Sequence, residues 1–177
     1  MRYNIFHVVH KGLKASMYQA ALDIVQNDFW NTDETAIIID RVQNLVLLFE
    51  KYTLFEDGVV LPAIGKYEPS VTDCFEKEHR QGYLLGKDLL QSLSAYQEAP
   101  VITSKAIAGR MIQHAYTRFL IFNIEDMTKK EDVLNKILWR YYSDAELAAI
   151  SRQATTFDIF PLPGNSVAKG LNNAETA

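Results

Sequence analysis

Apolar residues recur every three or four positions along almost the whole chain, and the alternating pattern typical of a β-strand is hard to find. This spacing predicts helices over about residues 4–27, 33–64, 70–96, 104–140 and 144–153. Asn31 followed by Glu34 has the spacing of a capping pair and supports the start of the second helix. Ser143 and Glu146 have the same relationship and support the start of the last one.

The order of these segments predicts how they pack. Long helices joined by short connections favour antiparallel neighbours, so we expect an all-α, antiparallel, up-down-up-down four-helix bundle with a short fifth helix. Pro62 lies near the end of the second helix and is expected to kink or finish it. We place one domain over residues 1–153 and an irregular tail over 154–177, where prolines, a glycine and polar residues dominate.

Polar residues interrupt the apolar stripe of each long helix. They are His10 in the first helix, Tyr52 and Glu56 in the second, His79 and Tyr83 in the third, and Asn123, Asp126 and Lys130 in the fourth. A buried charge without a partner is costly, so charged residues on an inward stripe need partners or ligands.

The heights of these residues along the helices support a common location. At about 1.5 Å per residue, the positions lie roughly 9 to 21 Å from one end of the bundle, with His10 nearest that end and Asp126 furthest from it. We therefore expect four helices to direct polar groups into one volume.

Composition excludes several classes of function. The 177 residues carry 18 basic and 22 acidic side chains, a net charge of −4, with no basic block beyond Lys129 and Lys130, so we expect no nucleic-acid partner. No apolar run approaches the ~20 residues that span a bilayer, and no secretory signal is visible at the start, so we expect a cytoplasmic protein without a membrane partner. The single Cys74 excludes an internal disulfide.

The segments around the inward polar residues resemble the hemerythrin-like, or HHE cation-binding, family of four-helix bundles. The family pattern places a histidine on the first helix, His-x-x-x-Glu on the second, a histidine on the third, and His-x-x-x-Glu or His-x-x-x-Asp on the fourth. The similar segments are HVVHKGL (7–13), YTLFEDGVVLP (52–62), FEKEHRQGY (75–83) and DMTKKEDVL (126–134). The resemblance extends over roughly residues 3–153.

The resemblance implies a non-haem di-iron centre used for oxygen binding or for iron and redox sensing. Three ligand positions are retained, by His10, Glu56 and His79. Other positions differ: Tyr52, Tyr83 and Asp126 stand where histidines are expected, and Lys130 stands where the bridging carboxylate is expected. The di-iron site implied by the resemblance is therefore degenerate.

Three interpretations of the altered positions remain open. In the first, His10, Glu56, His79 and Asp126 bind one divalent metal, iron, zinc or manganese. In the second, Lys130 replaces the metal, because one ammonium supplies positive charge and three donors to two facing carboxylates. In the third, the histidines are ordinary hydrogen-bonded core residues and the charges lie on the flanks of the helices. We favour the second.

We therefore expect a hemerythrin-like domain protein that is metal-free or at most mononuclear and acts as a binding or sensing module rather than an enzyme. The alternative is a working non-haem iron protein that senses or handles oxygen, nitric oxide or redox state. We expect no cofactor, or failing that one divalent metal. The partner protein is not identified by the sequence, and Trp139, Tyr141 and Tyr142 leave a homodimer contact open.

Overall fold

The computed structural model describes residues 2–159, and the regular secondary structure of this part of the chain is entirely helical, with no strand. Its four long helices are α1 (His7–Gln26), α2 (Thr32–Phe55), α4 (Pro69–Glu98) and α5 (Ile102–Tyr141). The shorter elements are the π-helical segment η1 (Glu56–Val60), α3 (Leu61–Gly65), α6 (Asp144–Arg152) and the 3-10 segment η2 (Gln153–Phe157). The prediction of an all-helical protein is confirmed.

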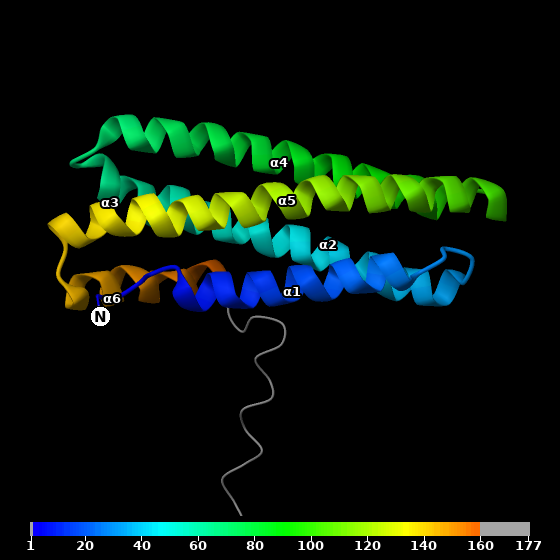
Figure 1. Ribbon diagram of the computed structural model, residues 1–177, viewed down its shortest axis with the longest axis horizontal. Helices are drawn as coiled ribbons and strands as arrows, with labels where there is room; N and C mark the ends of the chain where they lie inside the picture. The colour runs from blue at the N-terminus through cyan, green and yellow to red at the C-terminus, as the bar shows by residue number, and fades with distance from the viewer. Residues whose placement is uncertain (1, 160–177) are drawn as a thin grey trace, which may run out of the picture.

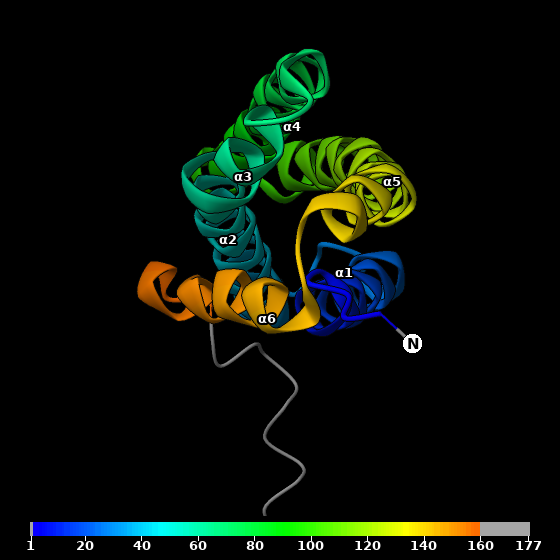
Figure 2. The same ribbon diagram turned by 90° about the vertical axis from the view of Figure 1, so that its left-hand side faces the viewer.

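The long helices run alternately in opposite directions. Figure 1 shows α1 and α4 pointing one way and α2 and α5 the other, with α6 turning back at one end. Figure 2 shows α4 on the side of the molecule opposite α1, with α2 and α5 between them. Helix α5 is therefore placed to bury side chains toward both α1 and α4.

Local sequence explains where two of these helices start. The Asn31 side chain accepts hydrogen bonds from the backbone N–H groups of Asp33 and Glu34, at 3.1 and 3.3 Å, and so caps α2. At the start of α6, the Ser143 side chain accepts from the Glu146 N–H, and the Glu146 carboxylate accepts from the Ser143 N–H. The predicted helix starts at Asn31 and Ser143 are confirmed, and the Ser143–Glu146 pair is reciprocal.

The predicted second helix is interrupted ahead of Pro62. A proline has no N–H and crowds the preceding turn, and the chain accommodates it with the wider π-helical turn Glu56–Val60. The N–H of Leu61 bonds to the carbonyl of Glu56, five residues back. Glu56 and Asp57 are the first two residues of this segment.

The packed part of the chain extends past residue 153. Residues 153–157 form the 3-10 segment η2, in which Ala154 is buried. The ring of Phe157 lies 5.8 Å from that of Phe55, so this segment packs on α2. The expected irregular tail thus begins with an ordered turn, because its apolar residues have a surface to cover. The remaining tail positions, 160–177, lie outside the described residues.

The core consists of large aliphatic and aromatic side chains from all four long helices, among them Leu13, Met17, Val42, Leu89 and Phe119. Within residues 2–159, no helix combines the length and apolar character that crossing a membrane requires. The fold therefore presents one continuous apolar interior, and its polar interruption is the feature that needs explanation.

Candidate functional site

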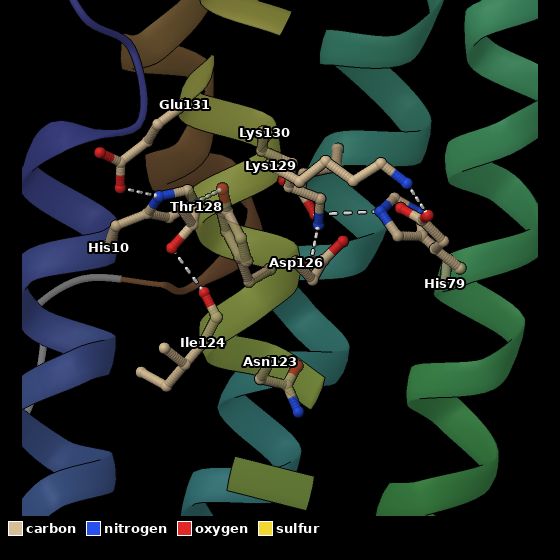
Figure 3. A network of polar contacts seen from close by, with 12 residues as sticks. His10, His79, Asn123, Ile124, Asp126, Thr128, Lys129, Lys130 and Glu131 are labelled. Carbon is tan, nitrogen blue, oxygen red and sulfur yellow. Dashed lines mark hydrogen bonds and ion pairs between the residues drawn. The ribbon is translucent and has the colours of Figure 1, made fainter. Parts of the chain in front are cut away.

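A cluster of polar side chains lies inside the helices, at the level of the π-helical segment. We call it the polar core and define it as Tyr52, Glu56, His79, Asp126 and Lys130. Tyr52, Glu56 and Lys130 are at most 2% exposed, and His79 is 8% exposed. Figure 3 shows Lys130 and Asp126 of α5 directed toward His79 of α4, whereas Glu131 points the other way, toward His10 of α1.

Lys130 is the centre of the polar core. Its Nζ lies 2.6 Å from Glu56 Oε2 and 2.6 Å from Asp126 Oδ2. Burial alone would lower the pKa of this ammonium, but the two carboxylates outweigh burial and raise it. Lys130 is therefore a held cation and a poor nucleophile.

The two carboxylates differ in their response to Lys130. Burial raises the pKa of Glu56, yet Lys130 and His79 more than compensate and bring it to about 2. Burial also raises the pKa of Asp126, and there the attraction to Lys130 is not enough to reverse the effect. Glu56, with two cationic neighbours, is thus the principal anion of the polar core.

His79 is held between two consecutive carboxylates. Its Nδ1 lies 2.6 Å from Asp57 Oδ1, and its Nε2 lies 3.2 Å from Glu56 Oε2. Burial would lower the pKa of the ring, but these contacts raise it to about 9, so the ring is cationic at neutral pH. Neighbouring residues of an α-helix project about 100° apart. The His79 ring lies between these two directions, so consecutive carboxylates contact its two nitrogens.

His10 lies on the other side of Tyr52 and is a neutral ring. Burial is the main cause that lowers its pKa. The His10 Nδ1 lies 2.7 Å from Glu131 Oε1, and the pKa of Glu131 is lowered to about 2, chiefly by this hydrogen bond. Because an ionised carboxylate only accepts, His10 Nδ1–H must donate to Glu131. Its Nε2 is then an acceptor, and the Tyr52 hydroxyl donates to it at 2.8 Å.

The structure brings together most of the predicted site residues. Tyr52, Glu56, His79, Asp126 and Lys130 meet in the polar core, and His10 joins it through the Tyr52 hydroxyl. The expectation for Tyr83 was wrong, because its side chain is 59% exposed. The inward face of α4 runs from His79 through the half-buried Gly82 to the buried Gly86, which turns position 83 outward.

Three contributing residues were not predicted. They are Asp57, which pairs with His79, and the pair Glu131 and Lys14, whose Nζ lies 3.0 Å from Glu131 Oε1. An apolar stripe assigns one inward residue to each helical turn. Because Lys130 already occupies that position, the directly following Glu131 is left out. Helix α5 lies between α1 and α4, so Lys130 and Glu131 point toward different helices, and the stripe in the sequence gives no signal of this.

The residues present do not fit the metal centre that the resemblance implies. Both ring nitrogens of His10 are already engaged, and the ammonium of Lys130 lies between the two carboxylates that would have to bind a cation. Within residues 2–159, no three or more His, Cys, Asp and Glu side chains are grouped as a metal ion would require.

A cleft of about 810 Å³ opens onto the polar core between α2, α4 and α5. Tyr52, His79, Asp126 and Lys130 line its inner end, and Asn123 lies one turn before Asp126 on the same wall. Three buried atoms near this end have no hydrogen-bond partner: Glu56 Oε1, His79 Nε2 and Asp126 Oδ1. Of these three residues, His79 and Asp126 line the cleft.

Comparison of the chain with models of protein families, with curated proteins and with solved structures finds no match. The polar core combines a held lysine and a cationic histidine, and the neutral His10, whose two nitrogens are both engaged, adjoins it. This set of paired groups is suited to holding charge in place and to offering one end of a binding cleft.

Proposed function

We propose that this protein is a hemerythrin-like four-helix bundle in which an internal ion-pair network stands in place of the metal centre, and that it acts as a metal-free binding or sensing module. The observation that carries the proposal is the position of Lys130, whose Nζ lies 2.6 Å from the carboxylates of both Glu56 and Asp126. The alternating directions of the four long helices are those expected for such a bundle.

Charge balance supports the replacement. Two facing carboxylates deep in a protein are unfavourable unless a cation lies between them. Lys130 supplies one positive charge there, and His79 supplies a second beside Glu56 and Asp57. Together these two cations provide the charge that a divalent ion would otherwise contribute, and a bound metal would have to displace Lys130 first.

The second candidate function is the working metal protein, with one iron bound for oxygen, nitric oxide or redox sensing. One observation favours it: Glu56 Oε1, His79 Nε2 and Asp126 Oδ1 are buried without hydrogen bonds, and all three are atoms that bind metals. This candidate requires Lys130 to turn away and His79 to lose its proton.

Elemental analysis distinguishes the two. The protein is expressed in iron-rich medium and analysed before and after anaerobic reconstitution with ferrous iron. We expect no stoichiometric metal in either sample, and an unfolding temperature that a chelator leaves unchanged, since a ligand bound to the folded state would raise it. Near-stoichiometric iron that disappears in His79→Ala would overturn the proposal in favour of the second candidate.

Lys130→Glu provides a matched variant for the same assay. It restores a carboxylate at the position where the family has one, and it removes the ammonium that repels a cation. We expect this variant to retain more iron than the wild-type protein and to be stabilised by ferrous iron. Equal iron contents in the two proteins would show that Lys130 does not stand in place of a metal.

A further inference from the structure

The cleft beside the polar core has the size of a small-molecule site. Its volume of about 810 Å³ lies within the roughly 300–1,000 Å³ typical of ligand pockets. Leu54, Tyr83 and Leu84 line it and are 60, 59 and 52% exposed, so its apolar wall reaches the surface. Clustered apolar side chains that remain exposed mark binding sites more often than chance placement does.

The two ends of the cleft differ in character. The deeper walls between the mouth and the polar core are made by Val46, Phe49, Phe119, Phe122 and the glycines Gly82 and Gly86. A Cβ added at Gly82 would lie 3.1 Å from the Phe122 ring, so α4 approaches α5 closely there. A ligand in this cleft therefore meets an apolar surface along most of its length and ionised groups at one end.

The inner end of the cleft has a free hydrogen-bond acceptor, which could accept from a donor on a ligand. Asp126 uses Oδ2 to bind Lys130, while its Oδ1 is buried and unpartnered, and the side chain is 10% exposed. The two cations at this end are charge-paired: Lys130 Nζ lies 2.6 Å from two carboxylates, and the His79 ring lies within 3.2 Å of Asp57 and Glu56, although its Nε2 makes no hydrogen bond. The charged residues lining the whole cleft are five acidic, Glu50, Asp57, Glu76, Glu78 and Asp126, and three basic, His79, Arg80 and Lys130.

We infer that the cleft binds a small amphipathic amine, with its ammonium group donating to Asp126 Oδ1 and its alkyl or arylalkyl body lying along the apolar walls. The inference rests on the proposed function, because it requires the polar core to be metal-free. An anionic head group would meet Asp126 and the acidic excess of the lining. A neutral head would leave that excess without a counter-charge.

The direct test compares three probes of equal chain length, n-decylamine, n-decanol and decanoate, each below its aggregation concentration. Binding to the full-length protein, treated with a chelator, is measured by titration calorimetry. We expect decylamine to bind at least about tenfold more tightly than decanoate, the size expected for one hydrogen bond to a charged group. Decanol is expected to lie between them.

Two variants locate the bound amine. Asp126→Asn keeps the shape of the side chain and removes its charge, so it should weaken decylamine about tenfold while leaving decanol within about threefold. A merely structural effect would weaken both probes alike. Leu54→Gln reduces the apolar mouth and should weaken decylamine about fivefold, whereas Leu22→Gln, at a leucine of α1 that does not line the cleft, should not.

Four outcomes would overturn the inference: no binding of decylamine, tighter binding of decanoate, equal effects of Leu54→Gln and Leu22→Gln, or equal weakening of amine and alcohol by Asp126→Asn. A wild-type dimer that Leu54→Gln converts to a monomer would also overturn it, by showing that a second copy covers the mouth. These results are separate from the metal analysis. A metal-free protein that ignores amines defeats only this inference, whereas a protein that retains iron defeats the proposed function.

Discussion

Lys130 Nζ of α5 and Glu56 Oε2 of the π-helical segment lie 2.6 Å apart, and neither residue is more than 2% exposed. The two positions are separated by 74 residues, so the contact depends on tertiary structure. Charges enclosed in this way are poorly screened, and each requires the other. Removing one partner should therefore be far more damaging than removing both.

Lys130→Met should destabilise the protein by about 3 to 5 kcal/mol, because it leaves Glu56 and Asp126 buried without a cation. The measurement is urea unfolding followed by circular dichroism at neutral pH. Lys129→Met is the matched control: Lys129 precedes Lys130, is about half exposed and pairs with Glu78 at the surface, so we expect a loss below about 1 kcal/mol.

Neutralising the carboxylates should rescue the lysine variant. Adding Glu56→Gln and Asp126→Asn to Lys130→Met removes the stranded charges, so the triple variant should be more stable than Lys130→Met alone. Additive losses across the three substitutions would show that these residues do not form one ion-paired unit.

Tyr52→Phe should destabilise the protein by about 1 to 3 kcal/mol, because it leaves the buried Nε2 of His10 without a donor. Tyr83→Phe removes the same hydroxyl from an exposed side chain and should cost less than about 0.5 kcal/mol. Chemical unfolding of both variants provides the comparison. Similar losses would mean that the Tyr52 hydroxyl does not satisfy His10.

Helical periodicity was enough to find those inward-facing residues that recur once per helical turn. His10, Glu56, His79 and Lys130 each fall on the apolar stripe of a long helix, and all four are buried. Tyr83 was assigned wrongly because a step of four from His79 is as regular as the step of three to Gly82 that the helix uses. The period of 3.6 residues per turn permits both, and only packing decides between them.

Asp57 and Glu131 could not be predicted in the same way. Asp57 follows Glu56 directly, and it contributes because the His79 ring of α4 contacts both carboxylates. Glu131 follows Lys130 directly. The two side chains contact different helices, His10 of α1 and Glu56 after α2, because α5 has neighbours on two sides. Which neighbours those are is set by tertiary packing, and a single stripe does not encode it.

Phe157→Ala should destabilise the protein by about 1 to 3 kcal/mol, although sequence patterning placed the domain boundary at residue 153. The ring packs beside Phe55, and its Cζ would lie 3.4 Å from a Cβ added at Gly58. Thr156→Ala, at an exposed position of the same segment, is the control and should have little effect. Thermal unfolding that does not separate the two variants would restore the earlier boundary.

The stability of the protein should decrease as the pH rises from about 6.5 to 9, because of His79. Burial disfavours the charged ring, but the carboxylates of Asp57 and Glu56 raise its pKa from 6.5 to about 9 on folding. A raised pKa means that folding favours the protonated ring, so the stabilisation is complete below pH 6.5 and disappears as the pH passes 9. The stabilisation by the protonated ring should amount to at most about 3 kcal/mol.

Urea unfolding between pH 6 and 9.5 tests this expectation. His79→Gln should abolish the alkaline decrease in stability, whereas His7→Gln, at an exposed position, should retain it. An unchanged slope in His79→Gln would mean that the ring is not held as a cation between Glu56 and Asp57.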